Sequence, residues 1–518
     1  MTHGTDPAPL PRRSREHQSE RRKNKDPRLS KSRFMGGLQC LKRLYFECFN
    51  RDLADEIPPD RQAIFDAGTR VGEIARDRYP GGRLVSDDFR RHKAAILNTS
   101  RLLPDKSISA IYEAAFLHEK IRIRADVLRR VRGDVFDLIE VKSTTRAKEE
   151  HVDDVALQLH VLRGAGVKIR RAGLLHLNRE YVYQGGDYDL EKLFSLADLT
   201  EEAEARQPEV GRQLETMWKA LAAGAAPDIK IGSHCEKPYV CPFYENCHRN
   251  GAVDENAHPV EELYYAGAGL LEKLRKKGFL DIRDIPEGYK ELNQKQSRQH
   301  EAVLKGTAII DRAGVAEVLG DLEFPIHFLD FETFNPALPL YAGTRPYDTL
   351  PFQWSDHVLA KDGNLTHHEF LHDGDGDPRP AFARSLIEIA GDTGTIATYS
   401  PFETTRMRDL ARWFPKLAPA LRALEERITD FLPLVRNNAY HPGFHGSFSL
   451  KAVLPALVPG FDYDDLDIAE GGMASIAYVE MIDPATAPKR AKALRAQLLA
   501  YCKHDTEALL KLFEKLSG

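Results

Sequence analysis

The sequence predicts a mixed α/β protein with more than one domain, and three observations support this prediction. Its 518 residues are too many for one ordinary hydrophobic core, so two to four domains are expected. Residues 121–177 alternate between strand-like and helix-like patterns. A second mixed region opens with a strand-like run near residue 322 and ends in a long helix near residues 490–516.

The first mixed region contains a hairpin, a helix and a further strand, in that order. Residues 121–128, IRIRADVL, alternate apolar and polar side chains, and residues 135–142, VFDLIEVK, follow after a short turn. Residues 152–164 have the apolar spacing of a helix, and residues 168–177 return to strand character. The stretch 255–320 is predicted to be helical and polar.

The second mixed region contains two further chemistry-bearing elements. The run HFLDFETF, residues 327–334, is predicted to be a buried strand, because its side chains are mostly apolar on both faces. Residues 395–403, TIATYSPFE, are predicted to form another buried strand that leads into a helix.

The composition is that of a globular protein in a reducing compartment. Apolar residues make up 42% of the chain and charged residues 29%, and no apolar run reaches membrane-spanning length. The first 33 residues lack the apolar core of a secretory signal. They are basic and polar, and we expect disorder there, either as a solvated extension or as a contact to nucleic acid. We expect a cytoplasmic location and no membrane partner.

The predicted hairpin carries the first candidate catalytic site. Glu140 and Lys142 share one strand face with apolar side chains, because side chains alternate along a strand. A buried carboxylate costs several kcal/mol unless it is paired or metal-bound. With Asp126 on the partner strand, two carboxylates would suit Mg²⁺ or Mn²⁺, and Lys142 would orient or activate the attacking water. The alternative is an ordinary Glu–Lys pair at a strand end.

These residues resemble the PD-(D/E)xK nuclease superfamily, in particular RecB-type nucleases and the CRISPR-associated four-cysteine nucleases. The resemblance implies a restriction-endonuclease-like domain in which Asp126 and Glu140 bind metal. It also implies that Gln158, in DDVALQLHVL, and Glu113, in IYEAAF, belong to the same site. The histidine that often lies on the first helix of this superfamily is absent from the segment GTRVGE, residues 68–73.

The cysteines indicate a metal centre. The chain has six, of which three lie within a short window. They are Cys40, Cys48, Cys235, Cys241, Cys247 and Cys502. Disulfides are not expected in a reducing compartment. Cys235, Cys241 and Cys247 are each separated by five residues, with Cys40 as the predicted fourth ligand and Cys48 as the reserve. The resemblance to the four-cysteine nucleases implies a structural [4Fe–4S] cluster, while structural zinc or no metal remain alternatives.

Four carboxylates and a tyrosine form the second candidate site. Asp330 and Glu332 lie on the same face of one strand, where two like charges repel unless a divalent cation separates them. Glu403 lies at the start of the helix into which the predicted strand of residues 395–403 leads. Tyr501 precedes Asp505 by four residues, so both face the same side of a helix.

This second pattern resembles the DEDD exonucleases of the ribonuclease-H-like fold. The resemblance implies that Asp330, Glu332, Glu403 and Asp505 hold two divalent ions and that Tyr501 positions the attacking water. Glu403 stands where Asp is usual in this family. Asp430, in RITDFLPLV, is a further acidic residue that could substitute or assist.

The segments FETFNPALPLYAGTRPYDTLPFQWS and AYHPGFHGSFSLKAVLPAL resemble a bacterial family of unknown function that fuses both domain types. The expected plan is a basic tail at 1–30, a PD-(D/E)xK domain with an iron–sulfur cluster at 31–250, a helical linker at 251–321 and a ribonuclease-H-like domain at 322–518. We expect a metal-dependent nuclease that acts on DNA, from ends or on single strands, with RNA left open. One domain could instead only grip the strand, or the whole chain could bind nucleic acid without cutting it. The sequence leaves protein partners open.

Overall fold

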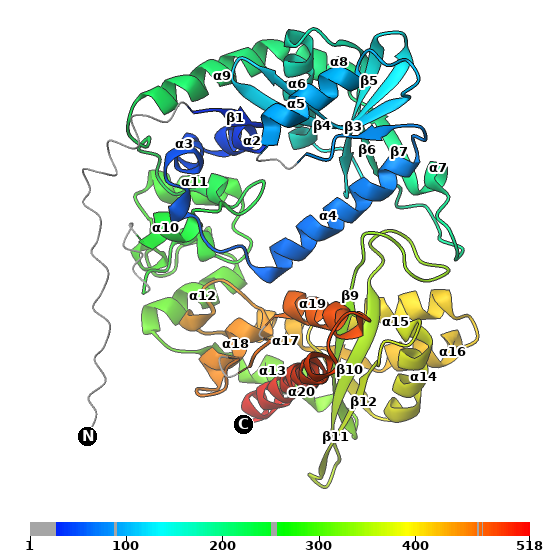
Figure 1. Cartoon of the computed structure of the whole chain (residues 1–518). Helices are drawn as coiled ribbons and strands as arrows, with labels where there is room; N and C mark the ends of the chain where they lie inside the picture. Colours follow the sequence, from blue (N-terminus) through cyan, green and yellow to red (C-terminus); the bar gives the residue numbers. More distant parts are fainter. Residues whose placement is uncertain (1–26, 88–90, 250–255, 464–465, 469) are drawn as a thin grey trace, which may run out of the picture. The chain divides into compact units, whose positions relative to one another are not determined.

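The computed structural model describes residues 27–87, 91–249, 256–463, 466–468 and 470–518. These residues form two compact units, 27–181 with 185–249 and 256–518 with 182–184. Each unit has its own sheet with helices packed against it (Figure 1), which confirms the predicted α/β class. Of the predicted basic tail, residues 1–26 lie outside the described residues.

The first unit is built on a seven-stranded sheet in the order β2-β3-β4-β5-β6-β7, with β1 beside β4. The strands are β1 (Leu29–Ser30), β2 (Arg83–Leu84), β3 (Ala110–His118), β4 (Ile121–Arg132), β5 (Val135–Lys142), β6 (Lys168–Leu177) and β7 (Phe194–Asp198). Strands β3, β4 and β5 form an antiparallel meander, and β6 runs parallel to β5. Helix α6 (Glu149–Gly164) makes the crossover between β5 and β6. The predicted order of hairpin, helix and strand is therefore confirmed.

Helix α6 is buried along most of its length, and its apolar residues Val155, Leu159 and Leu162 lie in the core of the first unit. The other helices of this unit cover the sheet or follow it in the chain. They are α2 (Lys31–Gln39), α3 (Leu41–Phe49), η1 (Arg51–Leu53), α4 (Pro59–Asp77), α5 (His92–Leu102), α7 (Leu190–Leu193), α8 (Thr200–Ala205), α9 (Gln207–Ala222), η3 (Ser233–Cys235) and α10 (Tyr244–Arg249).

The second unit is built on a five-stranded sheet in the order β11-β10-β9-β12-β13. The strands are β9 (Ile326–Phe334), β10 (Leu350–Leu359), β11 (Leu365–Leu371), β12 (Thr395–Thr398) and β13 (Ile428–Asp430), and β8 (Ile309–Ile310) pairs separately with β14 (Ala439–Tyr440). Strand β9 is central, antiparallel to β10 and parallel to β12. Its central position explains why its sequence is apolar on both faces.

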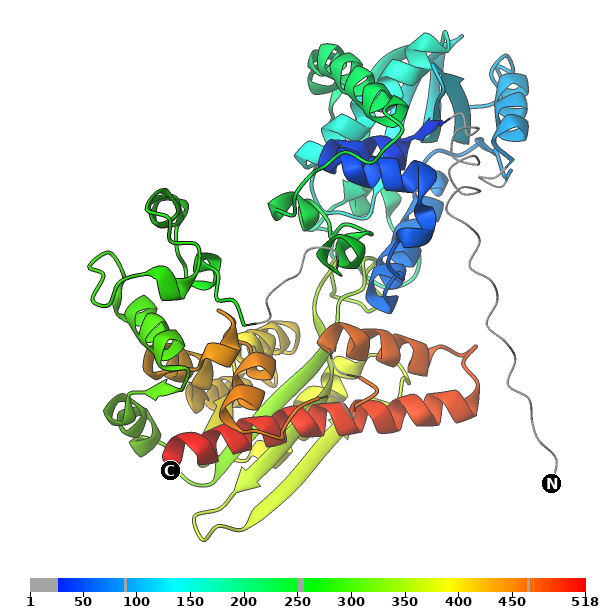
Figure 2. The same ribbon diagram turned by 90° about the vertical axis from the view of Figure 1, so that its left-hand side faces the viewer.

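The helices of the second unit include the long C-terminal helix that the sequence predicts. They are η4 (Val260–Glu262), α11 (Ala268–Lys276), η5 (Ile282–Asp284), α12 (Gln294–Lys305), α13 (Arg312–Gly320), α14 (Pro378–Ala390), α15 (Phe402–Trp413), α16 (Ala418–Glu426), α17 (Phe431–Asn438), η6 (Pro442–Phe444), α18 (Leu450–Leu457), α19 (Gly471–Ile482) and α20 (Pro488–Ser517). Helix α20 packs on β9 and β10 with α19 alongside it (Figure 2).

The predicted helical segment between the two mixed regions groups with the second unit in the structure. Its apolar residues Val260, Leu274 and Val303 share a core with Phe328 of β9. The described part of this segment therefore adds to the packing of the second unit.

In the part of the chain that the structure describes, every helix is either too short or too polar to cross a bilayer.

Candidate active sites

Strand β5 and helix α6 bring three predicted residues of the first unit together. The Lys142 ammonium donates to Glu140 Oε1 at 2.6 Å, and the Gln158 amide donates to Glu140 Oε2 at 2.7 Å. Glu140 is only 1% exposed. These residues, with Asp126, Asp154 and Lys31 introduced below, are called the β5 site.

Asp126 and Glu113 also lie at this site, on β4 and β3. The backbone N–H of Val141 donates to Asp126 Oδ2 at 2.8 Å. Burial and the neighbouring charge of Glu140 raise the pKa of Asp126 to about 7, and Glu113 adds to this effect. Glu113 has a φ of +56°, which is uncommon for a residue other than glycine, and it pairs with Arg76 at 3.3 Å. The structure therefore places Asp126 beside Glu140, and it places Glu113 near Asp126 on the neighbouring strand.

Two further residues complete the β5 site, and the sequence did not identify them. The Lys31 ammonium donates to Glu140 Oε1 at 2.5 Å. Asp154 is buried and accepts from Lys142 at 2.8 Å and from Gln158 at 3.0 Å. Lys31 is 109 residues away from Glu140 in the chain, so no local pattern reveals it. Asp154 precedes Gln158 by four residues on α6, so both lie on one helix face, and this spacing could have identified Asp154 from the sequence.

The charges of the β5 site compensate one another. Burial disfavours the charged form of Glu140, but Lys142 and Lys31 hold its pKa below the usual range. Burial also works against the Lys142 ammonium, but Glu140 and Asp154 hold its pKa well above the usual value. The site is therefore an ion-paired network in which Asp126 and Glu140 are the carboxylates suited to a hard divalent cation.

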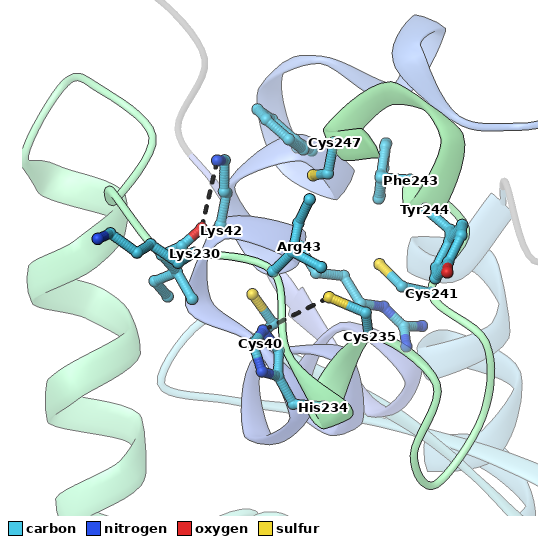
Figure 3. A pocket seen from close by; sticks show the side chains of 13 residues that line it. Cys40, Lys42, Arg43, Lys230, His234, Cys235, Cys241, Phe243, Tyr244 and Cys247 are labelled. Atoms are coloured by element: carbon cyan, nitrogen blue, oxygen red, sulfur yellow. Dashed lines mark hydrogen bonds between the residues drawn. The ribbon is translucent and has the colours of Figure 1, made fainter. Parts of the chain in front are cut away.

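The four predicted cysteine ligands line one pocket of the first unit, and Figure 3 shows their side chains around it. Cys40 lies between α2 and α3, Cys235 ends η3, and Cys247 lies on α10. Cys241 is buried in the loop between them, and its backbone N–H donates to the carbonyl of Cys235 at 2.7 Å. The reserve candidate, Cys48, is buried in the main core of the unit instead.

The pocket has properties that bear on which metal centre would fit. Among the described residues, no three of the cysteine sulfurs lie within 4.8 Å of one another. A tetrahedral zinc site, with Zn–S bonds of about 2.3 Å, needs sulfurs about 3.8 Å apart. Burial raises the pKa of Cys241 to about 11, so a thiolate there needs a cationic partner. Lys42 and Arg43 also line the pocket and supply positive charge.

The second candidate site gathers carboxylates from β9 and α20. One carboxylate oxygen from each of Asp330, Glu332 and Asp505 lies within 4.8 Å of the other two. Tyr501, one helical turn before Asp505, is buried, and burial together with the charges of Asp505 and Glu332 raises its pKa. These residues, together with Glu403, are called the β9 site.

Negative charge accumulates at the β9 site. Burial, then the charges of Asp505 and Glu332, raise the pKa of Asp330 well above its ordinary value. Burial and Asp505 do the same to Glu332, although Lys451 opposes the shift. Carboxylates so placed are stable only if they are protonated or if a cation lies between them.

Glu403 lies in the first turn of α15, is 4% exposed, and has its pKa raised to about 8 by burial. Its Oε2 atom is buried and has no hydrogen-bond partner in the part of the chain that the structure describes. The alternative acidic candidate, Asp430, caps the N-terminus of α17 by accepting from the Leu432 N–H at 2.9 Å. An unpartnered buried carboxylate oxygen fits a cation ligand, whereas Asp430 already has a structural role.

Two residues of the second unit extend the β9 site beyond the predicted set. The Lys451 ammonium, on α18, donates to the Tyr501 hydroxyl oxygen at 3.0 Å. The Tyr463 hydroxyl donates to Asp505 Oδ1 at 2.6 Å. Both lie more than forty residues from their partners in sequence, at 50 and 42 residues. The thiol of Cys502 also contacts Asp330 Oδ2 at 3.6 Å.

Comparison with known proteins reaches only the second unit. No curated protein and no solved structure matches the chain. A family model described as a domain of unknown function (DUF2779) matches residues 327–449. The match includes Asp330, Glu332 and Glu403 and ends before Tyr501 and Asp505. The core of the second unit is thus similar to a family whose activity has not been assigned.

Proposed function

We propose that the chain is a metal-dependent nuclease, and that its second unit is a DEDD-type 3′→5′ exonuclease domain. The observation that carries this proposal is the convergence of Asp330, Glu332 and Asp505 within 4.8 Å, with raised pKa values. The unpartnered Oε2 of Glu403 supports it. All four ligands are hard oxygen donors, which suit Mg²⁺ or Mn²⁺.

The residues around these carboxylates have separate tasks. Bound divalent ions would supply the activation of water and the stabilisation of the leaving oxygen. The Lys451 ammonium can only donate, so the Tyr501 oxygen accepts from it, and the Tyr501 hydroxyl proton stays available to the neighbouring carboxylates. The remaining lone pair of Tyr501 can accept a proton of the attacking water and orient it. Tyr463 holds the Asp505 carboxylate in place.

For the first unit we propose a PD-(D/E)xK nuclease domain. Asp126 and Glu140 would hold a divalent ion, and Lys142 would offset charge on the scissile phosphate. Lys142 and Lys31 already neutralise Glu140. This charge balance supports the alternative in which the first unit binds the strand and the second unit cuts it. The substrate would be DNA rather than RNA, because the PD-(D/E)xK nucleases that the first unit resembles act mostly on DNA, and the location would be cytoplasmic.

We also propose that Cys40, Cys235, Cys241 and Cys247 hold a structural [4Fe–4S] cluster. Among the described residues, no three of the cysteine sulfurs are as close together as one zinc ion requires, and a [4Fe–4S] cluster holds its four thiolates farther apart than a single ion does. Protein purified without oxygen should be brown, and Cys235→Ala should bleach it and destabilise the first unit. Cys48→Ala, outside the pocket, is the matched control and should stay brown. One zinc per chain without iron would contradict the cluster.

The nuclease proposal is tested by cleavage of end-labelled single- and double-stranded DNA and RNA, with Mg²⁺, with Mn²⁺ and with chelator. Asp330→Asn should remove stepwise shortening from the 3′ end, and Lys142→Ala should remove the remaining cleavage. Asp373→Asn, which changes an exposed carboxylate outside the β9 site, should cut as the natural protein does. Binding of the strands without any metal-dependent cleavage would contradict the proposal and support a binding protein.

A further inference from the structure

A second kind of metal-ligand cluster lies in the first unit, outside the β5 site. His118 ends strand β3, Glu119 lies in the turn between β3 and β4, and His160 lies on α6. One ligand atom from each lies within 4.8 Å of the other two. The Nε2 atoms of His118 and His160 are 3.7 and 3.8 Å from the two carboxylate oxygens of Glu119. Two imidazoles therefore face one carboxylate.

The contacts within this cluster are not hydrogen bonds, because both distances exceed hydrogen-bonding range. The Nε2 atom of His160 is buried and lacks any hydrogen-bond partner among the described residues. A buried ring nitrogen of this kind is normally satisfied by a protein group, by water or by an ion. Its position opposite Glu119 points to a ligand shared by the three side chains.

A similar cluster in the second unit provides a contrast. There, the Nδ1 atoms of His258 and His445 lie 3.1 and 3.2 Å from the two oxygens of Glu262. Hydrogen bonds therefore account for that arrangement, which ties η4 to the end of η6. Of these two clusters, the one in the first unit alone has a buried imidazole nitrogen without a hydrogen-bond partner among the described residues.

The three side chains are held on well-defined backbone. Glu119 and Lys120 have φ values of +46° and +64°, so the turn between β3 and β4 is tight and left-handed. The His118 ring packs against the end of α6, where a Cβ added to Gly164 would lie 2.1 Å from the ring. The ligands thus join the turn to α6, the helix that carries Asp154 and Gln158 of the β5 site.

We propose that His118, Glu119 and His160 bind a first-row transition-metal ion such as Ni²⁺, Co²⁺ or Zn²⁺. Imidazole nitrogens favour these ions, whereas Mg²⁺ prefers oxygen ligands. Bonds of about 2.0–2.1 Å would bring the ligand atoms to roughly 3.3 Å apart, a shift of a few tenths of an ångström that the exposed Glu119 can make. Solvent would fill the remaining coordination positions, and the bound ion would clamp the turn to α6.

The test is a calorimetric titration of the full chain with Ni²⁺ in excess Mg²⁺, so that the carboxylate sites are already filled. The natural protein should bind one more equivalent of Ni²⁺ than either His160→Ala or Glu119→Gln. Glu119 is 62% exposed, so its substitution leaves the core intact. His445→Ala, in the hydrogen-bonded cluster, is the matched control and should retain that equivalent. Any Ni²⁺ taken up by the cysteine pocket is common to all four proteins.

Hydrogen exchange gives a second measurement that does not depend on counting ions. Ni²⁺ should slow exchange in the β3–β4 turn and the last turns of α6, in the natural protein and in His445→Ala only. The proposal is overturned if His160→Ala and Glu119→Gln titrate like the natural protein. It is equally overturned if His445→Ala is the variant that loses the ion.

Discussion

The β5 and β9 sites both gather several carboxylates around one strand, but they balance the charge in different ways. At the β5 site, Lys31 and Lys142 each contact Glu140 within 2.6 Å, and the pKa of Glu140 is lowered. At the β9 site, the nearby lysine, Lys451, donates to a tyrosine oxygen, and the pKa values of Asp330 and Glu332 are raised.

This difference indicates which site depends more on a bound ion. A buried carboxylate is stable when it is paired, protonated or bound to a cation. The β5 site carries its own cations on the chain, so it can keep its geometry without metal. The β9 site gathers four carboxylates, of which Glu332 and Glu403 are buried. Glu403 has an oxygen without a hydrogen-bond partner among the described residues, and the site would need cations from solution to hold its carboxylates charged.

The largest expected effect comes from removing a ligand of the β9 site. Asp330→Ala and Asp505→Ala should each lower the 3′→5′ rate about 10³-fold or more, because ligands of one metal centre act as a unit. For the same reason the double variant should be no slower than either single one. Rates on a 3′-labelled single strand measure this effect. Losses that simply add would show that the two carboxylates act independently.

Removing one cation of the β5 site should have the next largest effect. Lys142→Ala leaves Glu140 with Lys31 alone and should slow cleavage by the first unit about 10²–10³-fold. Strand binding should stay close to that of the natural protein, as a gel shift would report. Lys192→Ala, which removes an exposed lysine paired with Asp189, is the control. Unchanged cleavage in Asp126→Ala and Lys142→Ala would indicate that this unit binds the strand without cutting it.

Stability should depend on pH in different ways in the two units. The pKa of Glu403 is raised to about 8 by burial, so in chelator its contribution is full below its unfolded value of about 4.3 and is lost as pH rises toward 8. Excess Mg²⁺ should remove that decline. Glu140 has a lowered pKa, so its contribution is present above the unfolded value and is lost in acid.

Hydrogen exchange of β9 and β5, corrected for intrinsic rates, can measure this contrast. In chelator, β9 should be less protected at pH 8 than at pH 5.5. Strand β5 should lose less protection, because Asp126, with a pKa of about 7, ionises there over this range while Glu140, with its lowered pKa, stays charged throughout. If the protection of β5 and β9 depended equally on pH, the two sites would not differ in how they balance the charge of their carboxylates.

The smallest effect is expected from the side chains that we propose to orient water at the β9 site. Tyr501→Phe and Lys451→Met should each slow the 3′→5′ reaction by about 10-fold, as expected for one lost hydrogen bond to a charged or polarised group. If Lys451 acts through Tyr501, the double variant should be no slower than Tyr501→Phe. Lys451→Arg should recover part of the rate. Additive losses would indicate that Lys451 contacts the substrate directly and does not act through Tyr501.

The strands and helices that carry the sites could be predicted because their signals are local. Alternation of side chains identified β4 and β5, and the apolar run identified β9. The residues that decide charge balance could not be found in this way. Lys31 and Lys451 reach their partners only through tertiary packing, across 109 and 50 residues. Asp154 was the exception, because helical spacing from Gln158 could have identified it.

The most direct test of this account is a Mn²⁺ binding titration followed by electron paramagnetic resonance. The account predicts that Asp330→Asn abolishes the tighter class of Mn²⁺ binding and that Glu140→Gln and Asp373→Asn leave this class in place. Binding that survives in Asp330→Asn and is lost in Glu140→Gln would contradict it, because the lysine-balanced site would then be the stronger metal centre.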